Sequence, residues 1–181
     1  MCRGGEHAFD LARSALLFTH TLREMIHHLK YADRVSLANP LGDILNECRR
    51  REPFTGRLVI PVPLHRSRER KRGFNQAQLI AARLGLPIAT QLLRRKKDTP
   101  SQTGLTRNQR KRNLAGAFEA RQKVSGTVIL VDDVYTTGST MDEIARTLKR
   151  SGADRVEVLT VARVPSYHAE ETAAAAVARI Q

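Results

Sequence analysis

One short segment, residues 128–140, constrains the fold of this 181-residue chain more than any other part of it. Its sequence, VILVDDVYTTGST, opens with four apolar residues that predict a buried β-strand. Two carboxylates, Asp132 and Asp133, follow at the C-terminal end of that strand, and a hydroxyl-rich turn then opens a helix. The carboxyl ends of parallel strands are where open α/β sheets bind their ligands.

The turn after the acids predicts a phosphate-binding site. A helix N-terminus presents free backbone N–H groups and the positive end of the helix dipole, and both favour an anion. Gly138 lets the backbone approach closely, and the neighbouring hydroxyls add donors. Because the two acids would repel a phosphate, we expect them to face vicinal sugar hydroxyls or a divalent metal ion. The alternative is a plain strand-to-helix turn in which Thr137 or Ser139 caps the helix.

Apolar patterning elsewhere predicts an α/β fold. A strand at residues 127–131, a helix at 141–148 and a strand at 156–162 form a β-α-β unit, which favours a parallel sheet. We therefore expect a mostly parallel central sheet of about four or five strands with helices on both faces. The remaining predicted elements are helices over 22–29, 37–48 and 76–84 and strands over 15–18, 58–60, 88–93 and 117–118.

Positive charge is concentrated in the middle of the chain. The net charge is +13, yet residues 49–112 alone hold 18 Lys and Arg against three acids, and the remaining residues sum to −2. Such a region attracts nucleic acid through its phosphates, or a small, densely charged ligand such as a polyphosphate. A solvated basic surface is the simpler alternative. Aromatic residues are only 4%, which does not favour a stacking platform for single-stranded nucleic acid.

Two further features bear on the setting of the protein. Cys2 and Cys48 are its only cysteines, which excludes a disulfide scaffold and a four-cysteine zinc site within this chain. The sequence has no run of 18 apolar residues and no apolar signal-peptide core near its start, so we expect no membrane span and a cytoplasmic location.

Residues 128–140 resemble the PRPP-binding signature of type I phosphoribosyltransferases. More of the chain resembles one branch, the ComF family of competence-associated phosphoribosyltransferase-like proteins, over residues 9–163. The amidophosphoribosyltransferase domain of purine synthesis is similar more distantly. The segments that carry the ComF resemblance are HLKY at 28–31, VPLH at 62–65, RKRGFNQ at 70–76, SQTGL at 101–105, RN at 112–113 and AF at 117–118.

The resemblance implies a type I phosphoribosyltransferase-like fold in three parts. Residues 1–55 would form a small N-terminal helical hood, 56–165 the phosphoribosyltransferase core and 166–181 a C-terminal tail. Residues 94–113, polar and basic, would be the hood loop that closes over the substrate. ComF relatives often carry an N-terminal zinc-binding cysteine cluster, but Cys2 stands alone here, so zinc is not expected.

The same resemblance assigns roles to individual residues. Asp132 and Asp133 would contact the ribose 2′ and 3′ hydroxyls of PRPP, partly through Mg²⁺. Asn75 and Gln76 would contact the substrate, or serve only packing and capping of a helix, and His65 has the alternative of a surface loop residue. The 5′-phosphate cradle would be Thr136, Thr137, Gly138, Ser139 and Thr140; the pyrophosphate loop Pro63, Leu64, His65 and Arg66; and the catalytic basic residues of the hood loop Arg107, Lys111 and Arg112.

The reaction that the resemblance implies is displacement of pyrophosphate at ribose C1 through an oxocarbenium-like transition state, with Mg²⁺ stabilising the departing charge. Purine-salvage members place an Asp where this chain has Thr136, so their carboxylate general base is missing and the acceptor is left open. The alternative is a non-catalytic protein that binds PRPP or a nucleotide and acts in DNA uptake. The expected partners are PRPP, with single-stranded DNA, DNA-uptake proteins and a second copy of the chain as further candidates.

Overall fold

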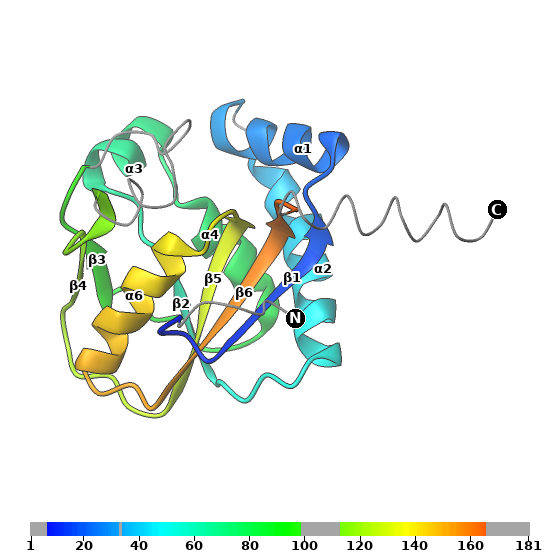
Figure 1. Cartoon of the computed structure of the whole chain (residues 1–181). Coiled ribbons are helices and arrows are strands. Elements are labelled where there is room, and N and C mark those ends of the chain that lie inside the picture. The colour runs from blue at the N-terminus through cyan, green and yellow to red at the C-terminus, as the bar shows by residue number, and fades with distance from the viewer. Residues whose placement is uncertain (1–6, 33, 99–112, 166–181) are drawn as a thin grey trace.

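The computed structural model describes residues 7–32, 34–98 and 113–165, and its centre is a four-stranded parallel sheet. The strand order is β1 (Leu11–Leu17), β6 (Arg155–Arg163), β5 (Thr127–Tyr135) and β2 (Leu58–Pro61), and every neighbouring pair is parallel. The α/β prediction is confirmed, and the first and last strands of the described chain lie side by side (Figure 1).

Alternate residues of the central strands face two separate cores. Val128 and Leu130 pack against α6 (Ser139–Arg150), whereas Ile129 and Val131 pack against helices on the opposite face. Figure 1 shows α6 on the near face of the sheet, with α2 and α4 behind it. Because both faces are covered, these strands are apolar throughout, as expected of a buried parallel sheet. The opposite face carries α1 (His20–Tyr31), η1 (Val35–Leu37), α2 (Ala38–Arg51), α4 (Gln76–Ala81) and η2 (Ala82–Leu84).

A second, two-stranded antiparallel sheet lies beside α6. It pairs β3 (Leu93–Arg95) with β4 (Phe118–Ala120), and its Leu93 and Phe118 side chains join the core under α6. The predicted strand over residues 88–93 is therefore wrong in its extent. Ile88 forms only an isolated bridge to Val59, and the chain turns before β3 begins. The strand predicted over 15–18 instead covers Leu11–Leu17.

Sequence patterning did not predict α3 (Arg66–Arg72), which buries none of its residues. With no buried face, this helix has no apolar periodicity to detect. It begins where His65 Nδ1 accepts a hydrogen bond from the Ser67 backbone N–H, at 3.3 Å, and ends at Gly73 in the left-handed region with φ 83°. A glycine in the left-handed region commonly follows the last turn of a helix.

A buried carboxylate fixes the chain as it enters β2. Glu157, on β6, has no exposed surface and accepts hydrogen bonds from the backbone N–H groups of Thr55 and Gly56, each at 3.0 Å. Arg155 Nε donates to the same carboxylate at 3.0 Å. Within the described ranges, none of the helices combines the length and the apolarity that crossing a membrane would require.

Candidate functional site

The two acids lie in a cavity at the C-terminal edge of the central sheet. The strand β5 continues to Tyr135, so Asp132 and Asp133 lie within its end rather than beyond it. We call this space of about 400 Å³ the acid-pair cavity. Its walls come from α1, the turn after β2, α3, α4, β3, β5, the turn after β5 and α6. Its lining residues are Lys30, Tyr31, Val62, Pro63, Leu64, Arg68, Arg72, Gln76, Arg95, Asp132, Asp133, Val134, Thr136 and Thr140.

Asp133 is the better-neutralised acid of the pair. Its buried side chain forms an ion pair with Lys30 Nζ and accepts a 3.3 Å hydrogen bond from Gln76 Nε2. Burial alone would raise the pKa of Asp133, but the Lys30 ammonium and these hydrogen bonds outweigh it and hold that pKa below its usual value. The same contact keeps the pKa of Lys30 above its usual value despite burial. Lys30 and Asp133 are therefore both charged at neutral pH.

Asp132 is in the opposite electrostatic situation. Burial and the adjacent Asp133 carboxylate raise the pKa of Asp132 well above its ordinary value. Its Oδ1 accepts a 2.9 Å hydrogen bond from the backbone N–H of Asp133. Asp132 is half-buried and faces the cavity, and its raised pKa makes it the acid that gains most from a new hydrogen-bond donor or cation.

Arginine side chains also line the acid-pair cavity. Arg72 lies over the ring of Tyr31 at 5.2 Å and donates to Gln76, while Arg95 lies over the ring of Phe118 at 5.5 Å. Burial and the nearby Arg68 lower the pKa of Arg95. A cavity lined by both carboxylates and guanidinium groups suits a ligand that carries hydroxyls at one part and strongly anionic groups at another.

The turn that follows β5 forms a small cradle beside this cavity. Gly138 immediately precedes α6 and has φ 74°, and a Cβ at this position would collide with the Tyr135 hydroxyl. Thr137 and Ser139 bond to each other through their hydroxyls at 2.9 Å, and neither caps the helix. Neither Thr137 nor Ser139 therefore caps the helix, so the alternative of a plain capped helix start does not describe this turn. The hollow over this turn is about 30 Å³ and is lined by Asp132, Val134, Tyr135, Thr136, Gly138, Thr140 and Met141.

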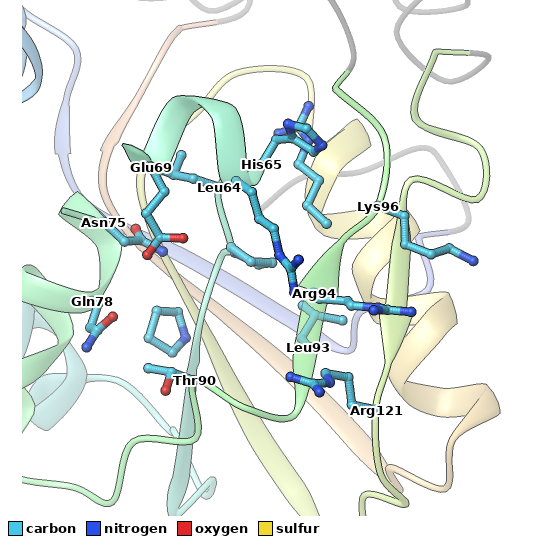
Figure 2. A pocket seen from close by; sticks show the side chains of 14 residues that line it. Leu64, His65, Glu69, Asn75, Gln78, Thr90, Leu93, Arg94, Lys96 and Arg121 are labelled. Carbon is cyan, nitrogen blue, oxygen red and sulfur yellow. The ribbon is translucent and has the colours of Figure 1, made fainter. Parts of the chain in front are cut away.

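The four residues 63–66, predicted as one pyrophosphate loop, divide between two cavities. Pro63 and Leu64 line both the acid-pair cavity and a second cavity, whereas His65 and Arg66 line only the second one, which Figure 2 shows. His65 Nδ1 lies 2.9 Å from Ser67 Oγ and 3.3 Å from Asp98 Oδ2. The predicted hood residues Arg107, Lys111 and Arg112 lie outside the described residues.

Asn75 and Gln76 take different roles. The Asn75 side chain caps α4 by accepting from the Ala77 N–H at 3.0 Å and donates to the Val62 carbonyl at 3.0 Å, which fixes the turn after β2. Gln76 faces Asp133 in the acid-pair cavity. Of the two predicted roles, helix capping therefore describes Asn75, whereas Gln76 is a residue of the candidate site.

Lys30, Arg68 and Arg72 are site residues that sequence reasoning did not assign. Lys30 follows the buried Ile26 by four positions, which places it on the inner face of α1. A lysine on a buried helix face requires a counter-charge, so this spacing was the available signal. For Arg68 and Arg72 no such signal exists, because α3 has no buried face.

The described residues suit Mg²⁺ only as an ion that arrives with its ligand. Among them, no three His, Cys, Asp or Glu side chains gather as a metal-binding group. Asp133 is already paired with Lys30, and Asp132 is the remaining carboxylate of the cavity. Two acids, one of them engaged, can complete the shell of a magnesium ion that also holds phosphate oxygens and water.

Comparison with known proteins shows a consistent set of relatives. The model of the phosphoribosyl transferase domain matches residues 70–179. The chain is 38% identical over 157 residues to the DNA utilization protein YhgH of Salmonella typhi, covering 81% of this chain and 69% of that protein. It is 32% identical to competence protein F of Haemophilus influenzae, with the same coverage of 81% and 69%. It is 29% identical to competence protein ComFC of Bacillus subtilis, covering 77% of this chain and 58% of that protein.

Proposed function

Because the chain belongs to the competence protein F family and carries its phosphoribosyl transferase domain, we propose that it binds PRPP and transfers the phosphoribosyl group with release of pyrophosphate. The acid-pair cavity would hold the ribose and the pyrophosphate. The cradle at residues 136–140 would hold the 5′-phosphate. The acceptor is left open, because Thr136 stands where a carboxylate base would otherwise act.

The observation that carries this proposal is the continuity of two chemically different spaces. Asp132, Thr136 and Thr140 line both the acid-pair cavity and the hollow over the phosphate turn. A ligand with a phosphate in the hollow would therefore present its next atoms to Asp132. In a ribose 5-phosphate unit those atoms are the sugar ring and its hydroxyls, which carboxylates accept hydrogen bonds from.

The transfer step uses charges that are already in place. The bond between ribose C1 and the pyrophosphate oxygen breaks, and pyrophosphate leaves with the bonding electrons. The acceptor forms a bond to C1 and gives up its proton to solvent water. Lys30, Arg68 and Arg95 would stabilise the leaving group, and Mg²⁺, held in part by Asp132, would supply further positive charge to the phosphates. No side chain needs to act as a nucleophile.

Calorimetric titration with PRPP and Mg²⁺ tests the binding part of the proposal. Asp132→Asn with Asp133→Asn should lower PRPP affinity about tenfold or more, since a charged hydrogen bond is worth about 1.5–3 kcal/mol. The matched control is Asp43→Asn with Glu47→Gln, which removes two exposed acids from the outer side of α2. Equal PRPP affinity in the wild type and the acid-pair variant would contradict the assignment. Release of pyrophosphate in the presence of candidate acceptors tests the catalytic part.

A specific observation also favours single-stranded DNA as a second candidate ligand. Lys30, Tyr31, Arg68, Lys71 and Arg72 line a basic cavity of about 380 Å³, and Tyr31 is 67% exposed with Arg72 over its ring. Basic groups around an accessible ring are suited to a phosphate backbone and a stacked base. The acid-pair variant separates the two candidates, because loss of two negative charges should tighten DNA binding while it weakens PRPP binding.

A further inference from the structure

A second cavity lies on the far side of the turn that bounds the acid-pair cavity. It measures about 360 Å³, within the range of small-molecule sites, and shares Pro63, Leu64 and Arg95 with the acid-pair cavity. We call it the Glu69 cavity. Its walls come from the turn after β2, α3, α4 and the β3–β4 sheet, and its other lining residues are Pro61, His65, Arg66, Glu69, Asn75, Gln78, Thr90, Leu93, Arg94, Lys96 and Arg121.

One wall of the Glu69 cavity is cationic beyond what its neighbours neutralise. Arg94 and Lys96 share the carboxylate of Glu119. Among the described residues, neither Arg66 nor Arg121 has a carboxylate partner. Together with Arg95, five cationic side chains line the cavity, and Glu69 is the one acid among the described residues of its lining. Such an excess of guanidinium groups favours a multiply charged anion such as a phosphate ester.

The part of the lining from α3 and α4 contributes Arg66 but also offers hydrogen-bond acceptors. Figure 2 shows Glu69, Gln78 and Thr90 on one side of the cavity and Arg94 and Arg121 on the other. Among the described residues, Glu69 has no ion-pair partner and the Gln78 side chain forms no hydrogen bond, whereas the Asn75 amide is already used at both ends. A carboxylate that has no ion-pair partner among the described residues can accept a hydrogen bond from a donor on a ligand.

We propose that the Glu69 cavity is a second ligand site, which binds a phosphorylated small molecule whose other end carries N–H donors such as an exocyclic amino group. The phosphate faces Arg94 and Arg121, and the amino end faces Glu69 and Gln78. PRPP has no N–H group, so this ligand is distinct from the one assigned to the acid-pair cavity. The site goes beyond the proposed transferase function and does not depend on it.

Adenosine 5′-monophosphate is the probe, titrated by calorimetry with saturating PRPP and Mg²⁺ present. Arg121→Ala should weaken its binding about tenfold or more, since the arginine–phosphate contact is charge-assisted. The matched control is Arg70→Ala, which removes one exposed arginine from α3 without touching either cavity. The titration is repeated with Gly138→Val, in which the added side chain blocks the cradle at residues 136–140. Binding of the probe to this variant cannot use that cradle, so the result stands even if PRPP does not bind. Circular dichroism of each variant verifies its fold.

The decisive measurement is the direction in which Glu69→Ala changes the affinity for the probe and for inorganic phosphate. If Glu69 accepts a hydrogen bond from the amino group, the variant binds adenosine monophosphate more weakly and inorganic phosphate more tightly. If the variant binds both more tightly, the cavity recognises only an anion and the proposal is overturned. Displacement of the probe by an oligothymidylate that Glu69→Ala also binds more tightly would assign the cavity to a nucleic-acid backbone, and would likewise overturn it.

Discussion

Lys30 on α1 forms an ion pair with Asp133 at the end of β5, so the N-terminal helix supplies the counter-charge of the acid pair. The Lys30 side chain is 22% exposed and that of Asp133 is 5% exposed. Breaking a buried pair leaves one charge without compensation, and this costs more than the intact pair contributes. The stability of the sheet edge and the charge state of the site therefore depend on one contact.

Lys30→Met should destabilise the protein by about 2–3 kcal/mol, somewhat below the loss for a fully buried pair because Lys30 keeps some solvent contact. Urea unfolding at neutral pH measures the change. Lys30→Met combined with Asp133→Leu should recover much of the loss, since neither charge of this ion pair is then left without its partner. Lys71→Met, at an exposed position of α3, is the control and should change stability little.

The two acids should respond to pH with opposite signs. The lowered pKa of Asp133 means that its ionised form stabilises the fold above the ordinary carboxyl range, and that this stabilisation is lost as pH falls. The raised pKa of Asp132 means the reverse: the fold loses stability as pH rises through that raised value.

Asp132→Asn should therefore be more stable than the wild type at neutral pH, and the two should converge as pH falls towards about 4, where the ordinary carboxyl also protonates. Thermal unfolding between pH 4 and 8 measures this, with Glu24→Gln on the exposed side of α1 as the control. A variant that is less stable than the wild type across this range would contradict the assigned pKa direction.

Gly138→Ala and Gly73→Ala separate backbone strain from collision. Both glycines have positive φ, 74° and 83°. A Cβ at Gly138 meets the Tyr135 ring, whereas one at Gly73 has no neighbour within 4 Å. Gly73→Ala should cost about 1–2 kcal/mol, the strain of a left-handed residue, and Gly138→Ala should cost more. Urea unfolding gives both values, and equal losses would show that the Tyr135 contact is relieved cheaply.

Glu157→Leu should destabilise the protein by about 3 kcal/mol or more, because it leaves the N–H groups of Thr55 and Gly56 without their buried acceptor. Glu47→Leu is the control. It removes an exposed pair with Arg51 on α2, and such surface pairs contribute about 0–1 kcal/mol. Comparable losses in the two variants, measured by urea unfolding, would contradict the role given to Glu157.

Local pattern was sufficient for much of the fold. The β5–α6–β6 unit follows from apolar runs and helical spacing, because each of its elements buries a whole face. The position of β1 beside β6 could not be predicted, since pairing between distant segments produces no periodic pattern in the sequence of either segment. The short strand β3 has three residues, too few to show alternation.

The candidate site was predictable where the chemistry is local in sequence. The acids and the turn at residues 136–140 are consecutive along the chain, so their types and order are enough to predict a sugar-phosphate site from the sequence. The division of residues 63–66 between two cavities depends on how the backbone turns after Leu64, which residue types alone do not specify. The pairing of Lys30 with Asp133 joins two elements that are far apart in sequence.

The position of β6 between β1 and β5 has a consequence for how the protein is made. About 140 residues separate the end of β1 from the start of β6. At roughly 5–20 residues per second, a ribosome adds them in roughly 7–30 s. Throughout that interval β1 has no strand to pair with in the central sheet. A partly apolar strand that is synthesised early therefore stays unpaired until β6, the last of the described strands, is synthesised. Chaperone binding to β1 during synthesis, and release once β6 emerges, would be the cellular counterpart of this topology.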